Sequence, residues 1–197
     1  LSVAFHAFGR SGAQAGQVAL VGGAGPIGLL CAAILKAEGL TVIVSELSPL
    51  RRQKALDAGV ADHVIDPAAQ DVVAEVRALT GGRGADVAFE ATSVNVVLDT
   101  LVDALKPQGV LLVVSIWGRP ATLDMHKIVM KEIDLRGSIG YVNSHPATIA
   151  LVREGKVDLA PFITEVIGLG HLIDQGFDTL INRNETAVKI LVDPHAE

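Results

Sequence analysis

Three glycines near the start of the chain have the spacing of a phosphate-binding turn. Residues 21–28 read VGGAGPIG, so Gly23, Gly25 and Gly28 form the pattern Gly-x-Gly-x-x-Gly. Between a strand and a helix, the first glycine permits a tight turn, the second lets a pyrophosphate approach the backbone, and the third allows close helix packing. Pro26 suits the first helical turn, where an N–H has no partner, and that turn attracts phosphate. A purely structural turn is the alternative, so a second feature is needed.

An acidic residue supplies that second feature. The β-branched run TVIVS at 41–45 predicts a strand, and Glu46 follows it, 18 residues beyond Gly28. A carboxylate about 20 residues after the glycines is placed to accept hydrogen bonds from the adenosine ribose of a dinucleotide. A solvated carboxylate at a strand end is the alternative, and it leaves the spacing unexplained. The two features together predict a dinucleotide-binding site.

Glu46 also indicates which dinucleotide binds. NADP carries a 2′-phosphate where this carboxylate would lie, and two unit charges about 4 Å apart repel by about 1 kcal/mol in water and about 4 kcal/mol near a protein surface. Arg51 is close in sequence and would soften the preference. We therefore predict NAD as the cofactor.

The sequence contains none of the usual catalytic motifs. The six histidines are scattered and there is one cysteine, so no zinc site of usual ligand spacing is written in the sequence. Tyr141 is followed four residues later by His145 rather than lysine, and no Gly-x-Ser-x-Gly occurs. Asp124 with His126, and Tyr141 with His145, are conceivable acid–base pairs, but ordinary loop residues explain them as well. We predict a cofactor site with no catalytic residue and no metal ligand.

Strands and helices that would position these residues alternate along the chain. After an opening helix, strands are predicted at 18–21, 41–45, 63–65, 86–90 and 110–115, and helices at 27–38, 50–58, 69–80 and 94–105. Such alternation means parallel strands joined by right-handed crossovers, with helices on both faces. A sixth strand at 134–141 would complete it. We expect an α/β fold, a doubly wound parallel sheet of strand order 3-2-1-4-5-6.

The alternation is less regular beyond Trp117. Residues 121–130 are mixed, a helix is predicted at 146–154, and strand, helix and strand follow at 163–168, 171–181 and 187–192. This tail is too short to form a domain of its own. We expect a nucleotide-binding domain at 1–145, including the N-terminal helix, and a C-terminal αβ tail at 146–197.

Ligands of doubly wound sheets lie beyond the carboxyl ends of the strands. The loops after Glu46, Glu90, Val114 and Gly140 are therefore the candidate binding segments. Small side chains and free backbone groups in them suit a flat ring, although ordinary loop composition is the alternative. The residues that we place against the ribose and nicotinamide are Ala91, Thr92, Ser115, Ile116, Ile139, Gly140 and Tyr141.

Composition excludes several classes of partner. Half of the 197 residues are hydrophobic and 19% are charged, so the chain is not disordered. The net charge of −6 argues against nucleic acid or an anionic membrane as the main partner. The 25 uncharged residues at 11–35 contain glycines and a proline, which argues against a membrane span. Because Cys31 is the single cysteine and no signal peptide is evident, we predict a cytoplasmic location.

The start of the chain suggests a longer parent protein. Residues 1–8, LSVAFHAF, already show the apolar periodicity of a helix, and neither a Met nor a capping residue precedes them. The mean hydropathy of +0.45 points the same way, because a domain without its neighbour exposes apolar surface that the neighbour covered. An ordinary processed N-terminus is the alternative.

Seven segments of the chain carry a resemblance to a known family. They are LSVAFHA at 1–7, VGGAGPIGLL at 21–30, VSELSPLRRQKA at 44–55, GVADHVIDP at 59–67, GADVAFEAT at 84–92, LKPQGVLLVV at 105–114 and KEIDLRGSIGY at 131–141. In this order and spacing the chain resembles the medium-chain, zinc-dependent alcohol dehydrogenases, especially the sorbitol and 2,3-butanediol dehydrogenase branch. The resemblance extends through nearly the whole chain.

The resemblance implies a two-domain enzyme that oxidises a secondary alcohol or vicinal diol with NAD. In such enzymes a preceding catalytic domain supplies the zinc ligands, and zinc acts as a Lewis acid on the alcohol oxygen. The catalytic domain with its zinc ligands is absent from this chain, so we expect the chain to bind NAD(H) without turnover. The rival interpretation is a stand-alone, non-catalytic NAD-sensing domain.

The resemblance also implies roles for individual residues. Glu46 and Arg51 match the ribose contacts, and Ile27 covers the pyrophosphate turn. Ser93 stands where many relatives have glycine. The matches to two nicotinamide loops are Val114, Ser115 and Ile116, and Ile139, Gly140 and Tyr141. The resemblance further implies dimers or tetramers in which an edge strand near 121–130 pairs with its copy, and a tail that packs on the catalytic domain.

Overall fold

The chain forms two compact units in a computed structural model that describes residues 1–184 and 187–196. The first unit comprises Leu1–Val157 and the second Asp158–Glu197. The first contains a sheet with helices on both faces, and all of the candidate site residues lie in it.

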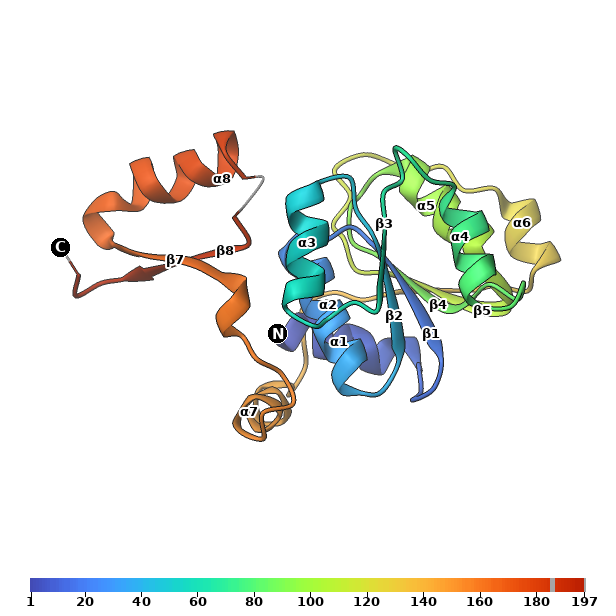
Figure 1. Cartoon of the computed structure of the whole chain (residues 1–197), viewed down its shortest axis with the longest axis horizontal. Helices are drawn as coiled ribbons and strands as arrows, with labels where there is room; N and C mark the ends of the chain where they lie inside the picture. Colours follow the sequence, from blue (N-terminus) through green and yellow to red (C-terminus); the bar gives the residue numbers. More distant parts are fainter. Residues whose placement is uncertain (185–186, 197) are drawn as a thin grey trace. The chain divides into compact units, whose positions relative to one another are not determined.

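The sheet of the first unit has six parallel strands (Figure 1). They are β1 (Val18–Gly22), β2 (Thr41–Ser45), β3 (His63–Ile65), β4 (Ala85–Glu90), β5 (Leu105–Val113) and β6 (Asp134–Gly137). Their order, β3-β2-β1-β4-β5-β6, confirms the expected doubly wound topology. All of these strands therefore end at one edge of the sheet, where the predicted loops follow.

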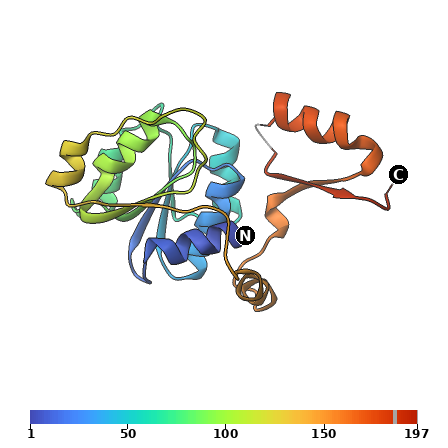
Figure 2. The same ribbon diagram turned by 180° about the vertical axis from the view of Figure 1, so that it is seen from behind.

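Helices cover both faces of this sheet, as Figures 1 and 2 show. One face carries α1 (Ser2–Ser11), α2 (Pro26–Ala37) and α3 (Pro49–Asp57), and the other α4 (Val72–Leu79) and α5 (Asn95–Ala104), with α6 (Met125–Met130) beside α5. The central strands are buried on both sides, so Leu20 and its neighbour Val21 are both fully buried. Such burial explains why these strands read as continuous apolar runs.

Several element boundaries differ from the prediction for local reasons. The helix predicted from residue 69 begins at Val72, because the Asp71 side chain caps it by accepting the N–H groups of Val73 and Ala74. The strand predicted at 110–115 begins earlier, at Leu105, with a shift of register beside β4. The strand predicted at 134–141 ends at Gly137, and Gly140 beyond it has φ of +57°.

The expectation of an edge strand near 121–130 is wrong for residues 125–130. Residues 125–130 form α6, capped by Asp124, which accepts the N–H groups of His126 and Lys127. Ile128 packs into the core on the α5 side, and Lys127 pairs with Asp103 at 2.7 Å. Within the described part of the chain, the sheet edge beyond β5 is instead β6.

The helix α7 (His145–Arg153) belongs to the first unit. The Ser2 hydroxyl at the start of α1 lies 3.1 Å from His145 Nδ1 and 3.3 Å from Thr148 Oγ1. The division into units falls after Val157, whereas the sequence suggests a boundary at 145/146.

The second unit is small. Its strands β7 (Ile163–Gly168) and β8 (Lys189–Asp193) pair in parallel, and a short 3₁₀ turn at Ala160–Phe162 precedes β7. The single helix predicted at 171–181 is divided into a 3₁₀ turn (Leu169–His171), a π-helical segment (Leu172–Phe177) and α8 (Asp178–Asn182). Across both units, none of the described helices is long and apolar enough to cross a membrane.

Candidate functional site

The glycine turn connects β1 to α2 at the carboxyl edge of the sheet. Gly23 has φ of +96°, a conformation that L side chains rarely adopt, and a Cβ there would lie 2.6 Å from Thr92 Cγ2. At Gly28 a Cβ would lie 1.9 Å from the carbonyl oxygen of Gly23. The fold itself therefore requires glycine at both positions, and Gly28 allows α2 to pack against the turn.

Gly25 is different, because the protein alone does not require glycine there. Its φ is −69°, which any residue adopts, and an added Cβ would meet nothing within 4 Å. It is the N-cap of α2, and it supplies no side chain to cap the first turn, where Pro26 follows. The open space beside Gly25 and the uncapped N–H groups of the helix start fit a pyrophosphate.

Glu46 lies beside this turn. Its Oε2 accepts the backbone N–H of Ala24 at 2.6 Å, and its Oε1 accepts that of Ser48 at 2.9 Å. The prediction that Glu46 belongs to the site with the glycine turn is therefore supported by geometry. Each carboxylate oxygen can accept a second hydrogen bond, which leaves capacity for ribose hydroxyls.

A neighbouring arginine that was not among the predicted site residues holds the Glu46 segment in place. Arg52 Nη1 donates to the carbonyl oxygens of Glu46 at 2.7 Å and Leu47 at 2.6 Å, while its Nη2 pairs with Asp66 at 2.8 Å. Arg51, the predicted ribose contact, is half-buried in the first turn of α3.

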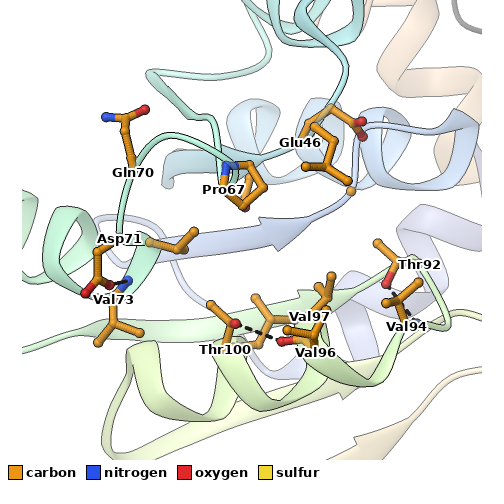
Figure 3. A pocket seen from close by; sticks show the side chains of 15 residues that line it. Glu46, Pro67, Gln70, Asp71, Val73, Thr92, Val94, Val96, Val97 and Thr100 are labelled. Carbon is orange, nitrogen blue, oxygen red and sulfur yellow. Dashed lines mark hydrogen bonds between the residues drawn. The ribbon is translucent and has the colours of Figure 1, made fainter.

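A cavity of about 460 Å³ opens next to Glu46 and Gly23. Figure 3 shows Glu46 and Pro67 across it from Thr92 and Val97. Most of the other lining side chains are apolar or small, and they come from the loop after β3 and from α4 and α5: Gln70, Asp71, Val72, Val73, Val94, Val96, Thr100 and Leu101. A mostly apolar slot beside the Glu46 carboxylate fits a heterocyclic base.

Most of this cavity was not predicted from the sequence. The predicted binding segments follow the first, second, fourth, fifth and sixth strands, whereas the loop after β3 contributes Pro67 and Gln70. The rule that ligands lie at carboxyl ends of strands applies equally to β3 and would have pointed there. The contribution of α5 through Val97 was not predictable without the packing of that helix.

The remaining candidates lie on three adjacent loops of the same edge. Ala91 and Thr92 follow β4, while Val114, Ser115 and Ile116 follow β5, and Ile139, Gly140 and Tyr141 come soon after β6. The side chains of Ile116 and Ile139 are 78% and 73% exposed. Two exposed isoleucines on neighbouring loops provide apolar contact area for a flat ring.

Glu90, the last residue of β4, connects two of these loops. From the sequence it was predicted only as the end of a strand. Its side chain is fully buried. It accepts hydrogen bonds from Thr92 and Ser93 on one loop and from Ser115 and Trp117 on the other. An acidic residue closing an otherwise apolar strand, as in VAFE, is the signal that could have identified it.

The conceivable acid–base pairs have structural roles instead. Asp124 accepts the backbone N–H of His126 at 2.9 Å as a helix cap. The rings of Tyr141 and His145 meet edge to face with centroids 4.8 Å apart, and His145 Nδ1 contacts Ser2. Among residues 1–184 and 187–196, no three His, Cys, Asp or Glu side chains are grouped to hold a metal ion.

Comparison with known proteins places this site in context. Residues 26–154 match a family model described as zinc-binding dehydrogenase. An (R,R)-butanediol dehydrogenase of Neisseria gonorrhoeae is 60% identical over 195 residues, which are 99% of this chain and 55% of that protein. The chain therefore spans about half the length of the curated relatives it matches.

Solved structures agree with the sequence comparison. The crystal structure of 2R,3R-butanediol dehydrogenase from Bacillus subtilis has a TM-score of 0.92 at 42% identity, covering 98% of this chain and 55% of that one. A protein from Sinorhizobium meliloti, described as a zinc-binding dehydrogenase and solved with NADP, has a TM-score of 0.83 at 26% identity, covering 98% and 57%.

Proposed function

Because the chain belongs to the zinc-binding dehydrogenase family, we propose that it is the cofactor-binding part of an NAD-dependent alcohol or polyol dehydrogenase. The observation that carries the proposal is the open space at Gly25, where neither the backbone conformation nor the packing of the free protein requires glycine. A bound pyrophosphate is the physical reason for glycine at that position.

The geometry supports a complete path for the dinucleotide along the carboxyl edge of the sheet. The pyrophosphate lies over Gly25 and the start of α2, with Ile27 covering the turn. The adenosine ribose binds the Glu46 carboxylate beside Arg51, and the adenine enters the cavity of about 460 Å³. The nicotinamide lies against the loops after β4, β5 and β6, and once bound it supplies the hydride acceptor.

We propose that NAD is preferred over NADP. The carboxylate of Glu46 would repel a 2′-phosphate, by about 4 kcal/mol for a 4 Å separation near a protein surface. The NADP complex of the Sinorhizobium meliloti protein indicates that NADP also occurs among similar proteins. The nucleotide choice therefore rests on Glu46 and its surroundings in this chain.

The substrate that we propose is a small secondary alcohol or vicinal diol, from the names of the butanediol dehydrogenases to which the chain is similar. Zinc in the whole enzyme would be held by residues outside this chain, so the chain alone binds NAD(H) without turnover. We further propose a cytoplasmic homo-oligomer, a dimer or tetramer. The exposed residues Val129 and Met130 of α6 and Leu135 of the edge strand β6 support self-association.

The rival is a stand-alone NAD-sensing domain, which would bind the same cofactor. Coding sequence rich in cysteine and histidine directly upstream of Leu1 in the gene would favour the dehydrogenase, and its absence would favour the sensor.

Titration with NADH and NADPH tests the cofactor assignment. Trp117, the single tryptophan, lies one residue beyond the proposed nicotinamide contact Ile116, so its emission should be quenched on binding. We expect saturable quenching by NADH and a much weaker response to NADPH. An equal response to both would overturn the NAD preference, and no response from a folded chain would overturn the binding site itself.

A further inference from the structure

Glu90 is the one charged side chain that is buried among the residues that the structure describes. It ends β4, and its carboxylate accepts five hydrogen bonds: from Thr92 N–H, Thr92 Oγ1, Ser93 N–H, Ser115 Oγ and Trp117 Nε1. Two carboxylate oxygens offer about four lone-pair sites, so this carboxylate is fully engaged.

The two oxygens hold different loops. Oε1 accepts the N–H and hydroxyl of Thr92, each at 2.6 Å, and the N–H of Ser93 at 2.9 Å, all from the loop after β4. Oε2 accepts the Ser115 hydroxyl and, at 3.2 Å, Nε1 of Trp117, both from the loop after β5. A single side chain therefore links the two loops.

Ser93 makes a second connection between the same loops. Its hydroxyl donates to the carbonyl oxygen of Ile116 at 3.1 Å. Its φ of +60° is a conformation that glycine adopts far more easily than serine. The backbone of serine is strained at this position, whereas its hydroxyl provides the hydrogen bond to Ile116 that glycine could not make. We call Glu90, Thr92, Ser93, Ser115 and Trp117 the Glu90 clamp.

If folding is the only purpose of the clamp, it joins two loops at a high cost in free energy. Among the residues that the structure describes, the donors to Glu90 are all neutral, so the carboxylate is buried with no cationic partner from this part of the chain. Burying a carboxylate carries a desolvation cost that neutral donors offset only in part. The loops that the clamp joins carry Ser115 and Ile116, the proposed nicotinamide contacts.

We propose that Glu90 is a positioning residue for the nicotinamide half of the cofactor site. Through the clamp it holds the loop after β5 in the conformation that receives the ring, before any cofactor binds. The inference rests on the proposed cofactor function and goes beyond it, because it concerns a side chain that need not touch the cofactor. Preorganised loops lose less conformational freedom on binding, which raises affinity.

The test compares binding of NADH with binding of ADP-ribose, which lacks the nicotinamide. We would measure both by calorimetry for the wild type, Glu90→Gln, Ser93→Gly and Asp86→Asn. Asp86→Asn is the matched control, since Asp86 is a hydrogen-bonded carboxylate at the other end of β4, bonded to Val18 N–H and Lys106.

We expect Glu90→Gln to weaken NADH binding by about tenfold, the scale of one hydrogen bond to a charged group. Its affinity for ADP-ribose should change much less. Ser93→Gly should weaken NADH binding in the same selective way while unfolding stability stays equal or rises, because glycine relieves the strain. Asp86→Asn should leave the ratio of the two affinities unchanged even if it lowers stability.

A readout without cofactor accompanies these measurements. Replacing the carboxylate that accepts Trp117 Nε1 should shift tryptophan emission in Glu90→Gln and raise its quenching by acrylamide. Equal losses of NADH and ADP-ribose affinity in Glu90→Gln, or no loss in either variant, would overturn the proposal. If the wild type bound neither ligand, the proposed function would fall, and the positioning role with it, even where the emission shift showed that the clamp exists.

Discussion

The Glu46 carboxylate and the backbone N–H of Ala24 are joined by a hydrogen bond of 2.6 Å. Ala24 lies between Gly23 and Gly25, so this bond ties the end of β2 to the glycine turn after β1. The two halves of the dinucleotide pattern are thus in contact in the free protein. Glu46 supports the turn and still lines the neighbouring cavity.

The first prediction concerns nucleotide choice. Glu46→Gln removes the negative charge that repels a 2′-phosphate, so the preference for NADH over NADPH should shrink by at least about tenfold. NADH affinity itself should also fall, because an amide cannot accept both backbone N–H groups. Calorimetric titration with both nucleotides measures the ratio. Glu38→Gln, at the far end of α2, is the control for charge, and an unchanged ratio in Glu46→Gln would remove Glu46 from the ribose site.

The second prediction separates two glycines of the same turn. Gly25→Ala should cost at most about 1 kcal/mol of stability, because its Cβ enters open space. It should weaken NADH binding by at least about tenfold, since the methyl group occupies the pyrophosphate position. Gly28→Ala should instead destabilise the fold by about 3 kcal/mol or more, because its Cβ would lie 1.9 Å from the carbonyl oxygen of Gly23.

Urea unfolding and NADH titration of both variants check this contrast. Normal NADH affinity in Gly25→Ala would exclude a pyrophosphate over this residue. A Gly28→Ala variant with wild-type stability would contradict the close packing of α2 against the turn.

The third prediction concerns Cys31. Burial raises the pKa of its thiol from the usual 9.0 to about 12, so almost no thiolate exists at neutral pH. The native protein should therefore resist a thiol reagent such as dithiobisnitrobenzoate at pH 8 and react with one equivalent after unfolding in urea. Because the pKa is higher in the folded state, this group's contribution to stability is complete below about pH 9 and is lost as the pH rises toward 12. Rapid reaction of the native protein would contradict the burial.

The fourth prediction concerns acid stability. Burial opposes ionisation of Asp86, but hydrogen bonds from Lys106 and from Val18 N–H outweigh it and hold the pKa of this carboxyl below its usual value. A lowered folded-state pKa means that the stabilisation exists above the unfolded value of about 3.9 and is lost as the pH falls below it. Urea unfolding between pH 7 and pH 3 should show a smaller loss of stability in Asp86→Asn than in the wild type. The same loss in both proteins would rule out this contribution.

The architecture could be predicted because its signals are local and repeated. Strands buried on both faces require apolar runs such as those at 18–21 and 41–45, and the helices between them require their own periodicity. Their alternation restricts the sheet to few topologies, and the observed order is the expected one.

Residues 121–130 show where such signals fail. Their mixture of apolar and polar residues suits an edge strand or a short helix, and in either case Asp124 is interpreted as an acidic loop residue. The helix forms because Asp124 caps it while Ile128 is buried on the α5 side and Lys127 reaches Asp103. These last two contacts cross between segments that the sequence does not mark as neighbours.

The sequence by itself determined the glycine turn, the acid at the end of the second strand and the doubly wound sheet, since each depends on backbone conformation and spacing within short segments. Only the tertiary structure decided that Pro67 and Val97 share a cavity and that Arg52 holds the Glu46 backbone. It alone brought Glu90 to Ser115 and Trp117, 25 and 27 residues further along the chain. Contacts of this kind depend on which strands become neighbours and in what register, and that is settled by packing of the whole sheet rather than by any one segment.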